Sequence, residues 1–127
     1  MEGFGTKSLV ADKMYALTKK SYYGVIAQDT VATIINDLIS VGASPLILNA
    51  YWADCGTGFL QDPKRMKDFI KGWEDACNEA SVTWGGGETP TLKGIIVDGT
   101  VDLGGSAVGI IKDRKNLVTD KKLKAGD

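Results

Sequence analysis

Residues 24–45, GVIAQDTVATIINDLISVGASP, are the stretch around which this chain is organised. Apolar side chains recur in it at helical spacing, which predicts a helix with one face in a core. These apolar residues are Val31, Ile34, Ile35, Leu38, Ile39 and Val41. Gly42 is well placed to end the helix in a left-handed cap, and Pro45 prevents the helix from resuming.

The opposite face of this helix is rich in oxygen atoms. Asp29, Thr33, Asn36 and Asp37 fall within about 100° of arc on a helical wheel. Such a stripe either faces water, as on an ordinary amphipathic helix, or lines a ligand site. The helix alone leaves both interpretations open.

Composition and charge exclude several classes of function. The chain of 127 residues suits a single domain, and its 15 Lys and Arg residues balance 16 Asp and Glu residues. The two signs are interspersed, which indicates neither a nucleic-acid partner nor a membrane surface. No apolar run has the length of a membrane span and no signal-peptide pattern is present, so a cytoplasmic location is expected.

The residue types that remain for chemistry are few. The sequence contains no histidine, which excludes Ser-His-Asp catalysis and histidine-ligated metals. Cys55 and Cys77 belong to no metal or redox spacing, so we expect buried or incidental thiols. Carboxylates, lysines, hydroxyls and backbone amides are left.

A glycine-spaced turn opens the chain, with the sequence Met1-Glu2-Gly3-Phe4-Gly5-Thr6-Lys7. Alternating glycines let backbone amides approach an anion, and Lys7 with the Thr6 hydroxyl supplies charge and a further donor. The turn lacks the complete pattern of a phosphate-binding loop. A purely structural turn is therefore the alternative.

Three consecutive glycines, Gly85-Gly86-Gly87, follow a predicted strand at residues 81–84. Glycine is a poor strand former, so we expect something other than packing to explain the run. Close approach of the backbone to a ligand or to another chain is the first interpretation, with Glu88 placing a carboxylate beside it. An ordinary glycine-rich turn with a surface glutamate is the second.

The other elements follow from periodicity and turn residues. A helix over residues 8–20 should pack through Leu9, Val10, Met14 and Leu17, and a helix starting at Asp62-Pro63 should bury Trp73 as a core anchor. We also predict a strand at 46–53 buried on both faces or covered by helices, a hairpin at 94–101, a buried strand at 103–112 and a solvated polar tail at 113–127.

This succession of elements predicts an α+β fold, with a mixed sheet of four or five strands and helices on one face. The other face of such a sheet would be apolar and uncovered. A second copy of the chain is its simplest partner.

Four motifs in register resemble the phosphoribosylformylglycinamidine cyclo-ligase (aminoimidazole ribonucleotide synthetase) superfamily over essentially the whole chain. The motifs are Glu2-Gly3-Phe4-Gly5-Thr6-Lys7, then Asp29 with Asn36-Asp37-Leu38 and Gly42-Ala43-Ser44-Pro45, then Gly86-Gly87-Glu88-Thr89, then Asp102-Leu103-Gly104-Gly105-Ser106-Ala107-Val108-Gly109.

The resemblance implies that residues 1–127 are the family's N-terminal nucleotide-binding domain, without the preceding segment and the C-terminal domain. Two copies would join their sheets into a β-barrel. The family enzyme uses ATP and Mg²⁺ to phosphorylate an amide oxygen of formylglycinamidine ribonucleotide, and a nitrogen of that molecule then closes the imidazole ring and expels phosphate. We expect the isolated chain not to turn over. The alternatives are a non-catalytic dimerising module and a superfamily member that phosphorylates a different substrate.

The resemblance also implies roles for particular residues. Gly3, Gly5, Thr6 and Lys7 would approach the phosphates, and Gly86, Gly87 and Thr89 would belong to the same nucleotide site. Asp37, with Asn36 beside it and Asp29 on the same stripe, would hold Mg²⁺ or orient the triphosphate. Glu88 would bring a further carboxylate to the metal, and Lys7 and Asp37 would be the catalytic pair. Glu2 stands where the family usually has aspartate, so a metal contact there would be displaced.

Overall fold

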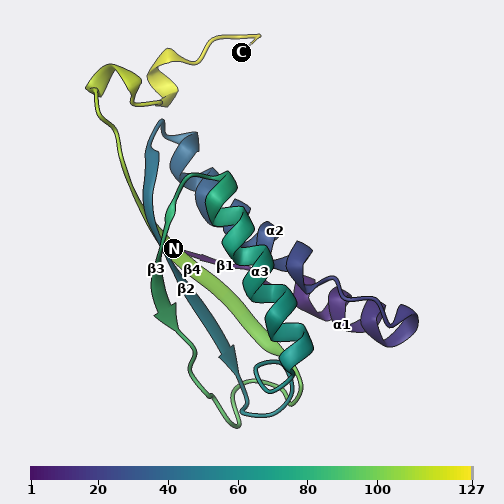
Figure 1. The fold of residues 1–127 in the computed structure, drawn as a ribbon. Helices are drawn as coiled ribbons and strands as arrows, with labels where there is room; N and C mark the ends of the chain where they lie inside the picture. Colours follow the sequence, from purple (N-terminus) through teal and green to yellow (C-terminus); the bar gives the residue numbers. More distant parts are fainter. Residues whose placement is uncertain (127) are drawn as a thin grey trace.

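The protein has two layers, a sheet and a set of helices over one of its faces (Figure 1). The structure, a computed structural model, describes residues 1–126. Its elements are β1 (Glu2–Gly3), α1 (Lys7–Thr18), α2 (Tyr23–Ser40), β2 (Ser44–Asp54), α3 (Pro63–Glu79), β3 (Thr83–Glu88), β4 (Val101–Ile110) and the short 3₁₀ helices η1 (Arg114–Asn116) and η2 (Asp120–Lys122). The predicted α+β class is confirmed, and within the described residues no helix covers the second face of the sheet.

The sheet is mixed, with the strand order β1-β4-β2-β3. β2 and β3 are parallel and joined by α3, whereas β4 is antiparallel to both β2 and β1. The hairpin predicted at 94–101 is wrong. The segment between β3 and β4 must instead pass the end of β2, where Leu92 N donates to Asp54 O at 2.6 Å and Asp54 N donates to Pro90 O at 3.2 Å.

Two helix ends follow local sequence rules. Gly42 adopts φ +83° directly after α2, Gly42 N donates to Ile39 O, and Ala43 N donates to Leu38 O, which together form a Schellman motif. At the start of α3, the Asp62 side chain accepts hydrogen bonds from Lys64 N and Arg65 N. Both predicted caps are confirmed.

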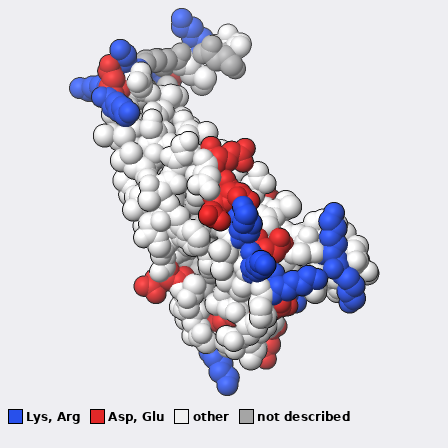
Figure 2. All heavy atoms as spheres, viewed as in Figure 1, with Lys and Arg blue, Asp and Glu red and all other residues white. Residues whose placement is uncertain are grey.

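Charges of both signs lie close together on the helix-covered side of the molecule, as Figure 2 shows. Lys71 and Asp75 of α3 form an ion pair on that side, and Lys7 pairs with Asp29. No helix among the described residues is both long enough and apolar enough to cross a membrane.

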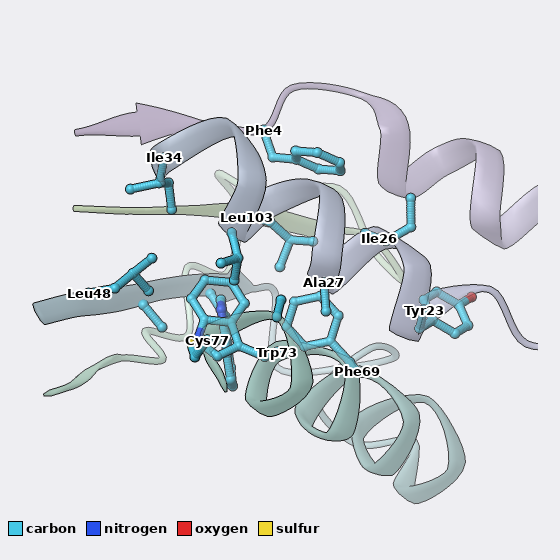
Figure 3. Packing of buried hydrophobic residues seen from close by; sticks show 14 of the residues in the cluster. Phe4, Tyr23, Ile26, Ala27, Ile34, Leu48, Phe69, Trp73, Cys77 and Leu103 are labelled. Carbon is cyan, nitrogen blue, oxygen red and sulfur yellow. The ribbon is translucent and has the colours of Figure 1, made fainter. Parts of the chain in front are cut away.

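The core lies between the sheet and the helices α2 and α3 (Figure 3). Trp73 is fully buried, as predicted, and the ring of Trp52 meets Phe69 and Trp73 edge-on at centroid distances of 5.0 and 5.1 Å. Ile34 of α2 and Leu48 of β2 complete the contact between the layers. These aromatic contacts pack α3 against β2 and β3.

Several residues predicted to be in the core are exposed. On α1, Leu9, Val10 and Leu17 are 39%, 60% and 80% exposed, because that helix instead turns Ser8 and Ala11 toward the sheet. Ile39 and Val41, at the end of α2, are also exposed.

The predicted burial of the two central strands is only partly correct. β2 and β4 have helices on one face only, so alternate residues of both strands, such as Tyr51 and Val108, emerge on the uncovered face. We call this surface the open sheet face.

Candidate functional site

The N-terminus of α1 has no acidic side chain bonded to its first amides, unlike those of α2 and α3. No side chain caps it and its first turn contains no acidic residue. By contrast, Asp62 caps α3, and Asp68 Oδ2 accepts a hydrogen bond from Gly24 N at 3.0 Å in the first turn of α2. The first amides of α1 therefore keep their partial positive charge for an external anion.

Lys7 adds a full positive charge to this helix end. Its Nζ lies 3.0 Å from Asp29 Oδ2 on α2 and 5.2 Å from the centre of the Phe4 ring. The structure thus brings together two of the predicted site residues. Both side chains are about half exposed, so the ion pair is accessible and weak.

A hollow of about 580 Å³ opens on the open sheet face. It collects residues from three of the four sequence motifs. Those in its lining are Glu2, Gly3, Gly87, Glu88, Asp102, Leu103, Gly104, Gly105 and Ser106, together with Met1 and with Asn49, Ala50 and Tyr51 of β2. Gly3 and Glu88, predicted from distant parts of the sequence, therefore border one space.

The three glycines belong to β3, and packing explains Gly87. A β-carbon on Gly87 would lie 2.1 Å from Ala50 O, whereas one on Gly85 would meet only the side-chain ends of Ile47 and Asn49, which can move. The expectation that packing could not explain the run is therefore wrong for Gly87. Gly86 differs, because its φ is +114° and no atom lies within 4 Å of its β-carbon position.

Trp84 fixes this glycine segment from the helix side. Its Nε1 donates to Gly86 O at 3.0 Å, and its ring lies 5.7 Å from that of Trp52. Thr89 follows directly after β3 and is exposed. The segment thus presents a supported, side-chain-free backbone to solvent.

Asp37 and Asn36 lie elsewhere, in the last turns of α2 and exposed to solvent. Asp37 lies near Ser44, the first residue of β2. Glu88 instead pairs with Tyr51, which is roughly 20 Å farther along that strand. One chain therefore does not bring the two predicted metal ligands together, and the described residues contain no group of three or more acidic or thiol side chains able to hold a metal. Single carboxylates suit Mg²⁺ only where phosphate oxygens and water complete its shell.

Asp102 is a site residue that we did not predict. It lines the hollow on the open sheet face and also a smaller one of about 200 Å³ beside Gly5 and Thr6. Asp102 thus borders both hollows, the one lined by Gly3 and Gly87 and the one lined by Gly5 and Thr6. The available signal was that it is the single charged residue within β4.

The two cysteines are buried free thiols, as predicted. Burial raises the pKa of Cys77 to about 11. This thiol therefore remains protonated, and not nucleophilic, at neutral pH.

Comparison with known proteins identifies the family. The family model described as "AIR synthase related protein, N-terminal domain" matches residues 1–111. The chain belongs to this family. It is 37% identical over 126 residues to the phosphoribosylformylglycinamidine cyclo-ligase of Carboxydothermus hydrogenoformans and 34% identical over 125 residues to that of Bacillus thuringiensis, alignments that cover 99% and 98% of the chain. It spans about a third of these relatives, namely 34% and 33% of their lengths.

Solved structures show the same architecture for this AIR synthase-related domain. A chain of a HypE–HypF complex superimposes with a TM-score of 0.58 and 27% identity, covering 69% of this chain and 28% of the other. The hydrogenase maturation protein HypE in complex with ATP superimposes with a TM-score of 0.57 and 22% identity, covering 68% and 24%. The second likeness concerns the fold alone.

Proposed function

We propose that this domain binds ATP and contributes to ATP- and Mg²⁺-dependent closure of the imidazole ring of formylglycinamidine ribonucleotide. The observation that carries the proposal is the hollow on the open sheet face, which is lined by Gly3, Glu88 and Asp102 from three motifs. The cyclo-ligase names of its relatives support the reaction, and the ATP complex of HypE supports the nucleotide. We place residues 1–127 as the N-terminal domain of a longer, cytoplasmic enzyme.

The residues of the chain suit phosphoryl transfer, which needs positioned cations and donors more than covalent chemistry. The amides of Gly5 and Thr6 at the start of α1, with Lys7, would hold phosphate oxygens. Gly86, Gly87 and Thr89 would follow the nucleotide along β3. Mg²⁺ neutralises phosphate charge when bound, and Glu88 or Asp37 would each offer it a single carboxylate, with Asn36 and Asp29 orienting the triphosphate.

A calorimetric titration with a non-hydrolysable ATP analogue and Mg²⁺ tests the proposal. Binding should weaken at least about tenfold in Lys7→Ala and in Asp37→Ala, since each loses a charge-assisted contact. Lys13→Ala, on the same helix as Lys7, and Glu74→Ala, an exposed acid of α3, are matched controls that should bind normally. Absence of binding by the wild-type chain would refute the proposal.

Trp84 offers a second readout for the same titration. Since its indole donates to Gly86 O, nucleotide along the glycine segment should change tryptophan fluorescence. Trp84→Phe should abolish most of that signal while leaving the calorimetric affinity close to wild type.

Two alternatives each have an observation in their favour. The exposed apolar residues of the open sheet face, among them Tyr51 and Val108, also suit a non-catalytic dimerising module, which would form a stable dimer indifferent to nucleotide. The likeness to a HypE chain suits a family member that phosphorylates another substrate. Ring-closure activity of the full-length protein distinguishes the second alternative from our proposal.

A further inference from the structure

α1 carries the Gly5–Lys7 turn into the proposed site, yet it has few apolar contacts with the rest of the chain. Its fully buried residues are the small Ser8 and Ala11. Ser8 Oγ donates to Val101 O at 3.3 Å, while Leu9, Val10 and Leu17 face solvent. Tyr15 adds a partly buried ring that packs against the core beside Tyr23, but apolar burial by α1 is small, so polar contacts must help to set the direction of this helix.

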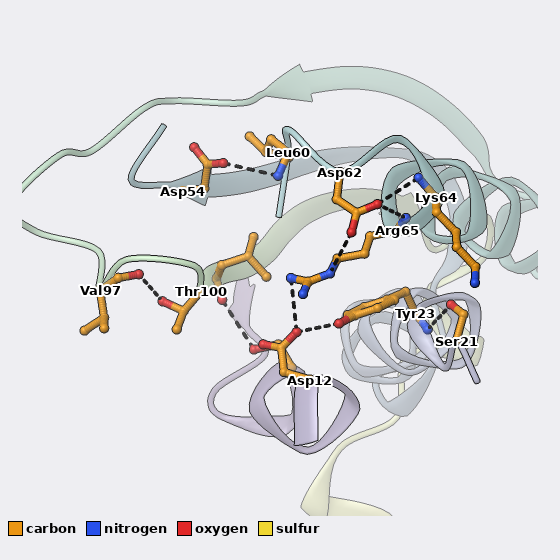
Figure 4. Close-up of polar contacts among 12 residues, drawn as sticks. Asp12, Ser21, Tyr23, Asp54, Leu60, Asp62, Lys64, Arg65, Val97 and Thr100 are labelled. Atoms are coloured by element: carbon orange, nitrogen blue, oxygen red, sulfur yellow. Dashed lines mark hydrogen bonds and ion pairs between the residues drawn. The ribbon is translucent and has the colours of Figure 1, made fainter. Parts of the chain in front are cut away.

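A polar network at the centre of α1 supplies that connection, and Figure 4 shows it. Asp12 Oδ1 accepts a hydrogen bond from the Tyr23 hydroxyl at 2.5 Å and lies 3.4 Å from Arg65 Nη1. Tyr23 begins α2 and Arg65 lies in the first turn of α3. One carboxylate of α1 is thus tied to both other helices.

The partners of Asp12 are themselves held in place. Arg65 Nε lies 3.2 Å from Asp62 Oδ2, and its guanidinium stacks at 5.4 Å over the Tyr23 ring and at 5.8 Å over the Tyr15 ring. Tyr23 is fully buried, and burial together with the Asp12 hydrogen bond raises the pKa of its hydroxyl, which keeps it a donor. Charge-assisted contacts with rigid partners of this kind fix geometry well.

The other side of the turn is fixed by the sheet. Gly3 pairs with Gly104, and Phe4 N donates to Leu103 O at 2.7 Å. The turn between Phe4 and Ser8 therefore has one anchor on β4 and one in α1.

From these contacts we infer that Asp12, Arg65 and Tyr23 are positioning residues, which orient α1 so that the Gly5–Lys7 turn meets the phosphates of the nucleotide. The inference rests on the proposed function and adds residues outside all four sequence motifs. None of the three touches the nucleotide, because they act through the direction of α1.

The test combines nucleotide affinity with hydrogen exchange on the whole chain. Asp12→Asn and Arg65→Met should each weaken binding of the ATP analogue about fivefold. Arg65→Lys, which retains the charge, should recover most of the affinity, and Lys67→Met, at an exposed lysine of α3, is the matched control that should bind as the wild type does. Amide exchange in α1 should accelerate about tenfold in Asp12→Asn while α3 keeps its protection.

A double-mutant cycle separates positioning from general stabilisation. If Asp12 acts through the turn, Asp12→Asn should weaken binding much less in a Lys7→Ala background than in the wild type. Additive losses, or unchanged exchange in α1, would overturn the positioning role. A wild-type chain that binds no nucleotide would overturn the proposed function instead, whereas equal binding by the wild type and Asp12→Asn would overturn only this inference.

Discussion

Gly87 has no room for a side chain. A β-carbon there would lie 2.1 Å from Ala50 O and would separate β3 from β2 at their shared register. The neighbouring Gly86 has space but a φ of +114°, which side chains rarely adopt. The same residue type thus serves two purposes within one strand.

Gly87→Ala should therefore lower the free energy of unfolding by about 2–4 kcal/mol, through the clash and the strained backbone. Urea denaturation measures the change. Gly3→Ala is the control, since its β-carbon would meet no atom within 4 Å, and it should stay within about 0.5 kcal/mol of wild type. Equal stability of the two variants would contradict the close β2–β3 contact.

Cys77 gives stability a specific pH dependence. Its thiol titrates near 9.0 when unfolded and near 11 when folded, so above pH 9 the unfolded state binds fewer protons. The free energy of unfolding should be flat up to about pH 8.5 and should then fall by about 2–3 kcal/mol by pH 11. Cys77→Ala should remove the part of this loss that begins near pH 9, leaving the part from Tyr23, whose raised pKa acts above pH 10. An unchanged pH profile in Cys77→Ala would exclude this thiol as the cause.

At the scale of elements, α2 and α3 cross with their backbones in close approach. A β-carbon on Gly72 of α3 would lie 2.3 Å from Gly24 O in the first turn of α2. Asp68 of α3 also bonds Gly24 N, so the crossing and the start of α2 are fixed together.

Gly72→Ala should lower the free energy of unfolding by about 2–4 kcal/mol, although alanine normally stabilises a helix by roughly 0.5–1 kcal/mol. Thermal and urea unfolding show directly whether Gly72→Ala lowers or raises the free energy of unfolding. Asn78→Ala, at an exposed position of α3, should be neutral or slightly stabilising. A stabilised Gly72→Ala variant would mean that the two helices lie farther apart.

The elements that could be predicted from sequence are those determined by residues close to them in the chain. The ends at Gly42 and Asp62 follow from neighbouring residues and were predicted correctly. The exposure of Leu9 depends on how α1 lies against α2 and β4, the missing hairpin depends on which strand lies beside β2, and the packing reason for Gly87 depends on Ala50 of the neighbouring strand. Periodicity carries no information about such partners.

The site residues also fall into those that sequence motifs indicate and those that depend on partners distant in the chain. Motif order led to the glycine segments, and Gly3 and Glu88 line one hollow, although β4 and β2 lie between their strands. Asp102 stood at the start of the fourth motif without an assigned role, and the network around Asp12 was missed, because their partners are distant in sequence. The roles of Lys7, Asp37 and the other assigned residues remain predictions to be tested by binding.

At the scale of the whole molecule, the open sheet face is an apolar surface without a cover in the described chain. Val108, 59% exposed, lies on it opposite Ile47, toward the end of β4. We propose that a second copy covers it by joining the two sheets into a barrel. Burying such a face stabilises association by the hydrophobic effect.

Val108→Lys should weaken dimerisation at least about tenfold, measured by sedimentation over a range of concentrations. Val25→Lys is a matched control, because Val25 is equally exposed at 59% but lies on α2, on the opposite side of the molecule. A wild-type chain that stays monomeric at all concentrations would refute the dimer, and an equal effect of both substitutions would assign the interface elsewhere.

The pairing of β1 with β4 also has a consequence for the order of folding. Glu2 pairs with Gly105, so β1 can take its place only after β4, which is synthesised much later, has emerged. Closing so long a loop costs entropy, and only contacts that form late offset that cost. We therefore expect β2, α3 and β3 to assemble early during synthesis, and the Gly5–Lys7 turn to take its place only once β4 has emerged, so that the proposed nucleotide site would form late.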